Sequence, residues 1–133
     1  MRGLDTNVLV RFLLRDDRNQ ATRAKAAIDR AIAAGEPLLV GLLTLLETEW
    51  VLRARARLSK SDIIGAFKHL LEVRELRFEN EDAVEQALYH FENNRADFAD
   101  CLMIAQYQRI GCHAMLTFDR RAARIPGGEM VPR

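Results

Sequence analysis

The sequence contains few of the residues that would place it in a disulfide-stabilised or zinc-binding class. It has only two cysteines, Cys101 and Cys112, and three histidines among 133 residues. The cysteines lack a CxxC spacing, and the histidines are too scattered to form a zinc signature. We therefore expect neither a disulfide framework nor a zinc site, and we interpret these side chains as structural.

Long apolar runs and a large excess of one charge are also missing. No segment approaches the roughly 20 apolar residues that cross a bilayer, and no secretion signal opens the chain. The net charge of +1 gives no overall signature of nucleic-acid binding, although positive charge can still be concentrated on one face. We expect a cytoplasmic protein without a membrane contact.

Lysine is scarce, and it occurs only at Lys25, Lys60 and Lys68. Most of the positive charge is therefore carried by arginine, whose planar guanidinium group binds phosphate with two parallel hydrogen bonds. A general compositional bias explains the same scarcity equally well. Arginine usage alone therefore does not identify a nucleic-acid-binding protein.

The remaining composition is that of a folded protein. Hydrophobic residues make up 49% of the chain and charged residues 29%, which is a globular balance. The length of 133 residues fits one domain, and we expect residues 1–133 to form a single one.

Short strands alternate with helices along the chain. Strands are predicted at 1–4, 38–40, 76–78, 112–117 and near 130–131, and helices at 8–14, from Asp16 or Asp17 to Gly35, and at 42–57, 62–72, 80–91, 97–109 and 120–124. Ser59 or Ser61 is expected to cap the helix at 62–72, Asn80 to cap the helix that runs to about 91, and Gly111 to end the helix at 97–109. Parallel strands need crossover connections, which helices normally provide. The pattern therefore predicts an α/β protein with a parallel sheet covered by helices on both faces.

Acidic residues stand where such a fold places functional sites. Asp5 and Asp119 each follow a predicted strand, so both are expected at the carboxyl edge of the sheet. Asp97 and Asp100 open a helix at a spacing that puts their side chains roughly 5–6 Å apart. Hard divalent cations prefer such oxygen ligands, and clustered carboxylates repel one another unless a cation neutralises them. The set therefore favours a divalent metal site.

Each of these residues also has a local explanation. Asp5 and Asp119 suit helix caps, and Asp97 and Asp100 suit the positive end of a helix. Thr117 can simply satisfy nearby backbone groups. Only convergence of the carboxylates in space distinguishes the two interpretations.

The helix predicted over 42–57 is apolar almost all round, which indicates that it is buried. Glu47 lies among its leucines and is therefore expected to be a buried carboxylate that needs a cation or hydrogen bonds. Glu49 points about 160° away in helical projection and is expected to be solvated or paired with Arg53.

The motifs and their order resemble those of a known family. They are Leu4-Asp5-Thr6-Asn7-Val8-Leu9, then Glu47 with Trp50, then Ala96-Asp97-Phe98-Ala99-Asp100, then Thr117-Phe118-Asp119-Arg120. The ordered set resembles the PIN-domain ribonucleases, and among them the VapC-type toxins of toxin–antitoxin pairs. Two departures, Gly3 in the first strand and Cys101 after Asp100, affect packing and not a predicted ligand.

The resemblance implies a fold, a cofactor and a reaction. The fold is a three-layer α/β/α arrangement with a short central parallel sheet of four to five strands. The reaction is cleavage of RNA, commonly transfer or ribosomal RNA, by a Mg²⁺- or Mn²⁺-dependent endoribonuclease. The implied acidic core is Asp5, Glu47, Asp100 and Asp119; the implied metal ligands are Asp5, Asp97, Asp100 and Asp119; Thr6, Asn7 and Thr117 would orient the carboxylates.

The resemblance also implies partners besides RNA. VapC-type relatives are usually dimers, or hetero-oligomers with an antitoxin that lays a helix into an apolar groove. Such a groove can use Leu13, Leu14, Trp50 and Leu58, although core burial explains these side chains as well. Candidate phosphate contacts near the site are Arg11, Arg15, Arg95, Arg120 and Arg121, each of which also suits an ordinary solvated surface.

Two other interpretations stay open at this point. A phosphoryl-accepting receiver domain is also a small doubly wound fold with an acidic pocket, but it usually needs a lysine after a late strand, and no lysine follows Lys68. A PIN-like domain that binds RNA or protein without cutting it is the second alternative. Labelling with an acyl-phosphate donor tests the receiver domain, whereas a nuclease is expected to keep its fold and lose RNA cleavage in an Asp5→Asn or Asp100→Asn variant.

Overall fold

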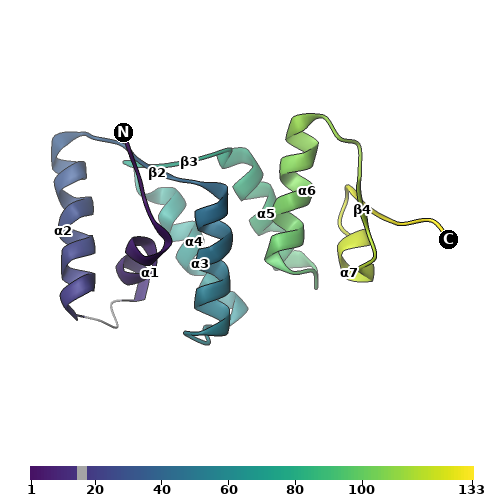
Figure 1. Cartoon of the computed structure of the whole chain (residues 1–133), viewed down its shortest axis with the longest axis horizontal. Helices are drawn as coiled ribbons and strands as arrows, with labels where there is room; N and C mark the ends of the chain where they lie inside the picture. The colour runs from purple at the N-terminus through teal and green to yellow at the C-terminus, as the bar shows by residue number, and fades with distance from the viewer. Residues whose placement is uncertain (15–17) are drawn as a thin grey trace. The chain divides into compact units, whose positions relative to one another are not determined.

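The computed structural model describes residues 1–14 and 18–133, and these residues fall into two compact units, Met1–Glu79 and Asn80–Arg133 (Figure 1). The two units are described separately below. Arg15, Asp16 and Asp17, which include a predicted phosphate contact and the predicted cap of the second helix, lie outside the described residues.

The first unit is an α/β unit with a three-stranded parallel sheet. Its elements are β1 (Arg2–Gly3), α1 (Thr6–Leu14), α2 (Arg18–Ala34), β2 (Leu38–Val40), α3 (Leu42–Ala54), α4 (Lys60–Glu72) and β3 (Leu76–Phe78). The strand order is β1-β2-β3, and Leu38 pairs with both Arg2 and Leu76. The helical crossovers required by parallel pairing are therefore present, as predicted.

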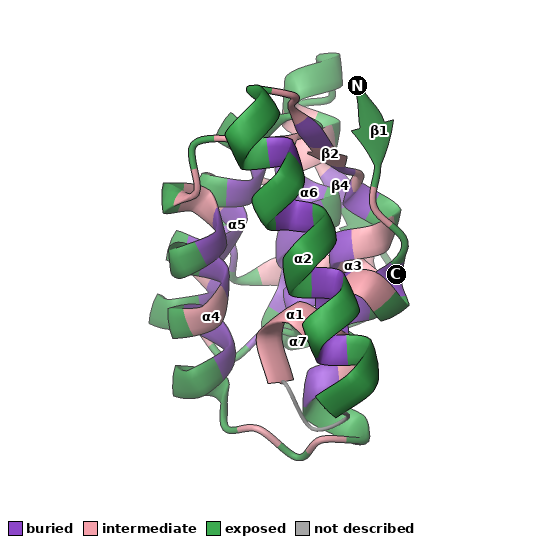
Figure 2. Ribbon diagram, turned by 90° about the vertical axis from the view of Figure 1, so that its left-hand side faces the viewer, coloured by how far each residue is buried: buried purple, intermediate pink, exposed green. Residues whose placement is uncertain are grey.

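Buried apolar side chains hold the helices of this unit to one another and to the sheet. Leu9 of α1, Val40 of β2, Leu52 of α3 and Phe67 of α4 are all almost completely buried. In α2 the buried residues recur at helical spacing and form a stripe along the helix, which Figure 2 shows in purple. Burial of one large apolar side chain contributes about 1.5–3 kcal/mol, so this core stabilises the edge of the sheet that carries Asp5.

Local signals in the sequence correctly predicted several boundaries in the first unit. The strands β2 and β3 have the predicted residues, and α2 ends at Ala34, directly before Gly35, whose φ of 67° suits glycine. Ser59 caps α4, because its hydroxyl oxygen accepts a hydrogen bond of 3.1 Å from the Asp62 backbone N–H.

The prediction that α3 is buried all round was wrong. Leu43 is 82% exposed and Trp50 is 45% exposed, although Leu45 and Leu52 on the same helix are buried. A helix that packs on one side leaves its opposite side in solvent even when leucines occupy that side.

The second unit contains α5 (Glu81–Asn93), α6 (Phe98–Ile110), β4 (Met115–Thr117), α7 (Arg120–Ala123) and β5 (Gly128–Met130). The helices α5 and α6 pack against each other, and β4 pairs with β5 in parallel. The described residues thus contain five strands, which pair in parallel within a three-stranded sheet in the first unit and a two-stranded sheet in the second. This arrangement agrees with the predicted α/β class and number of strands.

The short parallel pair in the second unit depends on two glycines. Gly127 has a φ of 100°, and a Cβ atom at Gly128 would lie 2.2 Å from the carbonyl oxygen of Ala122. Only glycine therefore lets the chain return from α7 to pair with β4 over so short a connection.

Two details of the second unit differ from prediction. The strand predicted from Cys112 begins only at Met115, because β5 offers three residues for pairing. Asn80 precedes α5 but makes no side-chain capping bond, since its backbone is left-handed with φ 53°. In the described part of the chain, no helix combines the length and apolar character needed to cross a membrane.

Candidate functional site

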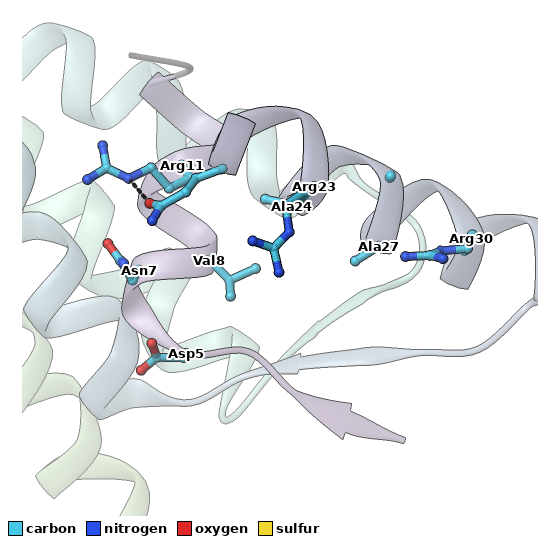
Figure 3. A pocket seen from close by; sticks show the side chains of 10 residues that line it. Asp5, Asn7, Val8, Arg11, Arg23, Ala24, Ala27 and Arg30 are labelled. Atoms are coloured by element: carbon cyan, nitrogen blue, oxygen red, sulfur yellow. Dashed lines mark hydrogen bonds between the residues drawn. The ribbon is translucent and has the colours of Figure 1, made fainter. Parts of the chain in front are cut away.

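Asp5 lies at the point where β1 passes into α1, as the strand pattern predicted. The backbone N–H of Leu4 donates to the carbonyl of Leu39 (2.8 Å), which fixes the end of the strand, and the carbonyl of Asp5 accepts the first bond of α1 from Leu9 (3.2 Å). The side chain of Asp5 is exposed beside that of Asn7 at the start of the helix (Figure 3). Thr6, predicted to orient this carboxylate, is buried as the first residue of α1.

Helix α3 is tied to the same edge of the sheet by a contact that the sequence did not reveal. The hydroxyl of Thr44 donates to the carbonyl of Leu4 (3.4 Å), directly before Asp5. Glu47 lies three residues after Thr44, about one helical turn along α3. Sequence spacing gave no signal for Thr44, since its partner is forty positions away.

A second long-range contact fixes the start of α3. The Glu79 carboxylate, which follows β3, accepts a hydrogen bond of 2.9 Å from the backbone N–H of Leu42. A carboxylate at this end of a helix satisfies an unpaired N–H group and complements the helix dipole. Glu79 is therefore a positioning residue at the carboxyl edge of the sheet, and local patterns could not identify it.

Asp5 and Glu47 line two pockets of the first unit that share residues. One pocket, of about 490 Å³, includes Asp5, Asn7 and Arg11. The other, of about 380 Å³, includes Asn7, Arg11, Glu47 and Trp50. Asn7 and Arg11 thus line both pockets.

The expected burial of Glu47 and exposure of Glu49 were reversed. Glu47 is exposed, whereas Glu49 is only 3% exposed. The predicted pairing of Glu49 with Arg53 is present, at 2.9 Å between Oε2 and the guanidinium Nε. Because α3 is apolar on nearly all sides, its composition did not indicate which side faces the core.

In the second unit, Asp97 and Asp100 stand at the start of α6. The carbonyl of Asp97 accepts from the backbone N–H of Cys101 (3.1 Å), yet its side chain makes no capping bond. Between them, Phe98 is buried and packs edge-to-face against Phe91 at 5.5 Å between ring centroids. This anchor holds the helix start in place, so local capping does not account for the Asp97 carboxylate.

Asp119 has the local role that its position suggested. Its Oδ1 accepts from the backbone N–H groups of Arg121 (2.7 Å) and Ala122 (3.1 Å), so it caps α7. Thr117 accepts from the backbone N–H of Asp119 (3.0 Å) and thereby fixes the turn between β4 and α7. The two capping bonds therefore orient the Asp119 carboxylate, and the bond to Thr117 fixes its backbone at the end of β4.

Asp97, Asp100 and Asp119 interact electrostatically within the second unit. The pKa of Asp100 is raised above its ordinary value, first by burial of the carboxyl group and then by the negative charges of Asp119 and Asp97. These residues come from two different elements, so their proximity results from tertiary packing. Asp97 and Asp119 thus lie near enough to Asp100 to act on it electrostatically.

The carboxylate oxygens of Asp97, Asp100 and Asp119 are the type of ligand that Mg²⁺ and Mn²⁺ prefer. Within residues 1–14 and 18–133, no three His, Cys, Asp or Glu side chains lie close enough together to bind one ion jointly. Electrostatic coupling acts over longer distances than direct coordination, so this result is compatible with the raised pKa of Asp100. Mg²⁺ keeps several water ligands and usually needs only one or two carboxylates. Oxygen donors carrying uncompensated negative charge fit such an ion.

Arginines and asparagines form a further small pocket in the second unit. It has a volume of about 200 Å³ and is lined by Asn93, Asn94, Arg95, Arg121 and Arg124. The sequence had identified Arg95 and Arg121 as candidate phosphate contacts. Arg124 was missed, because it lies one turn beyond the recognised motif.

The chain is similar to known proteins in sequence and in fold. The sequence profile of the PIN domain matches residues 4–128. Among solved structures, the chain is similar to a Mycobacterium tuberculosis protein, VapC20, described as a toxin that cleaves the sarcin-ricin loop, with 21% identity and a TM-score of 0.43; the alignment covers 99% of this chain and 100% of that one. No curated protein matches the chain. Because the profile spans nearly the whole sequence, the chain belongs to the PIN domain family, a family of nucleases.

Proposed function

We propose that this protein is a Mg²⁺- or Mn²⁺-dependent endoribonuclease and acts as the toxin of a type II toxin–antitoxin pair. Membership of the PIN domain family supports the nuclease activity. The observation that supports the metal dependence is the placement of Asp97 and Asp100 at the start of α6 and of Asp119 at the start of α7, where the charges of Asp97 and Asp119 raise the pKa of Asp100. Carboxylates held together against their mutual repulsion are suited to a divalent cation.

The proposed acidic core consists of Asp5, Glu47, Asp100 and Asp119, with Asp97 as an additional metal ligand beside Asp5, Asp100 and Asp119. Its residues come from both units, and the PIN profile crosses the boundary between them. We accordingly propose that residues 1–133 act as one domain. When bound, the ion would supply Lewis-acid polarisation of the scissile phosphodiester.

The remaining residues of the site are proposed to orient the acidic side chains and to bind the phosphates of the RNA. Thr117 holds the backbone of Asp119, and capping of α7 fixes the carboxylate of that residue. Arg95, Arg121 and Arg124 offer guanidinium groups to RNA phosphates, since arginine makes paired, charge-assisted hydrogen bonds with phosphate oxygens. No nucleophilic side chain is required of the protein.

Transfer or ribosomal RNA is the proposed substrate, which places the activity in the cytoplasm. A cognate antitoxin is the proposed protein partner, in a homodimeric or hetero-oligomeric assembly. Of the four groove residues expected from the sequence, Leu14 and Trp50 line the 380 Å³ pocket. A neighbouring reading frame for a small DNA-binding protein with an amphipathic tail would support this pairing.

The test compares matched carboxylate variants. Asp100→Asn and Asp82→Asn remove the same charge from the first turn of neighbouring helices in one unit, α6 and α5. Asp5→Asn is matched by Asp62→Asn, an exposed carboxylate in the first turn of α4. Purified proteins are incubated with total RNA and Mn²⁺, and the RNA ends are sequenced.

We expect Asp5→Asn and Asp100→Asn to lose cleavage and the two controls to retain it. The new RNA ends should also disappear when the divalent ion is chelated. Full cleavage by both Asp5→Asn and Asp100→Asn would contradict the proposed site. Binding of RNA by the wild type without any metal-dependent cleavage would favour a PIN-like binding domain instead.

A further inference from the structure

A groove on the first unit carries positive charge that the acidic site does not explain. It lies between α1 and α2, has a volume of about 490 Å³, and begins at Asp5. Figure 3 shows that arginines from both helices line it. Its full lining is Asp5, Asn7, Val8, Arg11, Gln20, Arg23, Ala24, Ala26, Ala27 and Arg30. Three arginines therefore accompany a single carboxylate.

Two of these arginines form a row along α2. Arg23 and Arg30 are seven residues apart, which is two helical turns, so they lie on the same side of the helix about 10.5 Å apart along its axis. Both are exposed, and neither has a hydrogen bond or ion pair among the described residues. The small side chain of Ala27 lies between them and leaves the space open.

Among residues 1–14 and 18–133, no acidic side chain forms an ion pair with Arg23 or Arg30. The acidic residue of α2, Asp29, is paired with Lys25 at 2.5 Å on the exposed surface. On α1, Arg11 is held across the groove by a 2.9 Å hydrogen bond from its Nε to Oε1 of Gln20. The groove thus presents one positioned guanidinium group and two exposed ones to solvent.

We propose that Arg23 and Arg30, together with Arg11, hold the phosphate backbone of a single-stranded RNA segment on its approach to Asp5. This inference rests on the proposed nuclease function and extends it to the substrate path. Charge complementarity indicates the occupant: arginine binds phosphate strongly, and the apolar residues that line the groove are only Val8 and three alanines. A protein helix that docks through its apolar face needs larger apolar side chains beneath it.

Contacts to the backbone position RNA without reading its sequence. Removal of the row should therefore weaken binding of unrelated sequences equally. For single strands, the slope of log affinity against log salt changes by about 0.7 for each phosphate contact. Loss of two contacts should reduce the slope by about 1.4, with affinity at low salt falling roughly tenfold per arginine.

The experiment uses the full chain and two unrelated, fluorescently labelled single-stranded oligoribonucleotides in EDTA, so that binding is measured without cleavage. The double variant Arg23→Gln with Arg30→Gln is compared with Arg74→Gln and Arg77→Gln, an equal charge change elsewhere on the first unit. Anisotropy is followed across a KCl series, and circular dichroism checks the helix content. Ala27→Glu, which places a carboxylate within the row, is the second test variant.

The expected result is a lower salt slope for the α2 double variant and weaker binding by Ala27→Glu, with the control double variant unchanged. Equal slopes and affinities for the two double variants would overturn the proposal. Cleavage by the wild type with Mn²⁺ is measured separately. A failed RNA path is then distinguishable from a failed nuclease assignment, because the binding assay requires no metal and no cleavage.

Discussion

Substitution of Asp119 by asparagine or by alanine separates its structural role from its proposed catalytic role. Asp119 accepts two backbone hydrogen bonds at the start of α7, of 2.7 and 3.1 Å. Asparagine is as good an N-cap as aspartate, and its loss of charge also relieves the repulsion with Asp100. Asp119→Asn should therefore be nearly as stable as the wild type, within a few tenths of a kcal/mol.

Asp119→Ala removes the cap as well as the charge. The capping bonds contribute about 1 kcal/mol, which corresponds to a fall in Tm of roughly 3–5 °C for a chain of this size. Both variants should lose RNA cleavage, because both lose a carboxylate of the proposed acidic core. The difference between them is therefore expected in stability alone.

The assay combines thermal denaturation in EDTA with RNA cleavage in Mn²⁺, measured on the same preparations. Asp82→Asn is the control for loss of charge, because it removes a first-turn carboxylate of α5 that lies outside the proposed acidic core. The reasoning is refuted if Asp119→Asn cleaves RNA at the wild-type rate. It is equally refuted if Asp119→Asn destabilises the protein as much as Asp119→Ala does.

Three further predictions concern stability. Arg53→Met should lower the free energy of unfolding by about 1–3 kcal/mol, because it removes the partner of the buried Glu49 carboxylate; the half-exposed Arg53 keeps the effect modest. An unchanged urea midpoint of unfolding would contradict a stabilising role for this ion pair. Asp100→Asn should stabilise the metal-free protein at neutral pH. Because the pKa of Asp100 is raised in the folded protein, the wild type loses stability as the pH rises from below 3.8 through the raised pKa. In thermal melts at several pH values, the stability difference between variant and wild type should therefore grow over that window and vanish in strong acid. Gly65→Ala within α4 should stabilise by about 0.5–1 kcal/mol, whereas Gly111→Ala at φ 109° should destabilise by about 1 kcal/mol or more, and equal Tm shifts would refute the backbone argument.

The local part of the fold could be predicted because its signals are local. The strands β2 and β3, the Ser59 cap and the glycine after α6 follow from apolar runs, capping chemistry and backbone freedom within a few residues. The strand β4 was predicted too long, since strand length depends on the partner strand, and β5 supplies only three residues.

The burial of individual glutamates could not be predicted in the same way. Glu47 and Glu49 lie two residues apart on α3, and only the packing direction of that helix buries one and exposes the other. Because α3 has apolar residues on nearly every side, it lacks the periodic pattern that normally identifies the buried face of a helix. The ion pair with Arg53 was predictable, because a spacing of four residues brings the two side chains together on any helix.

The sequence by itself determined the alternation of strands and helices, the order of the acidic motifs and the family, since each is written in residue types and their spacing. Only the tertiary structure decided which groups far apart in the chain meet. The bond from Leu42 to Glu79, the influence of Asp119 on Asp100 and the arginine-lined groove between α1 and α2 are examples. Such contacts depend on how whole elements pack, and packing is set by the shape and burial of many side chains together.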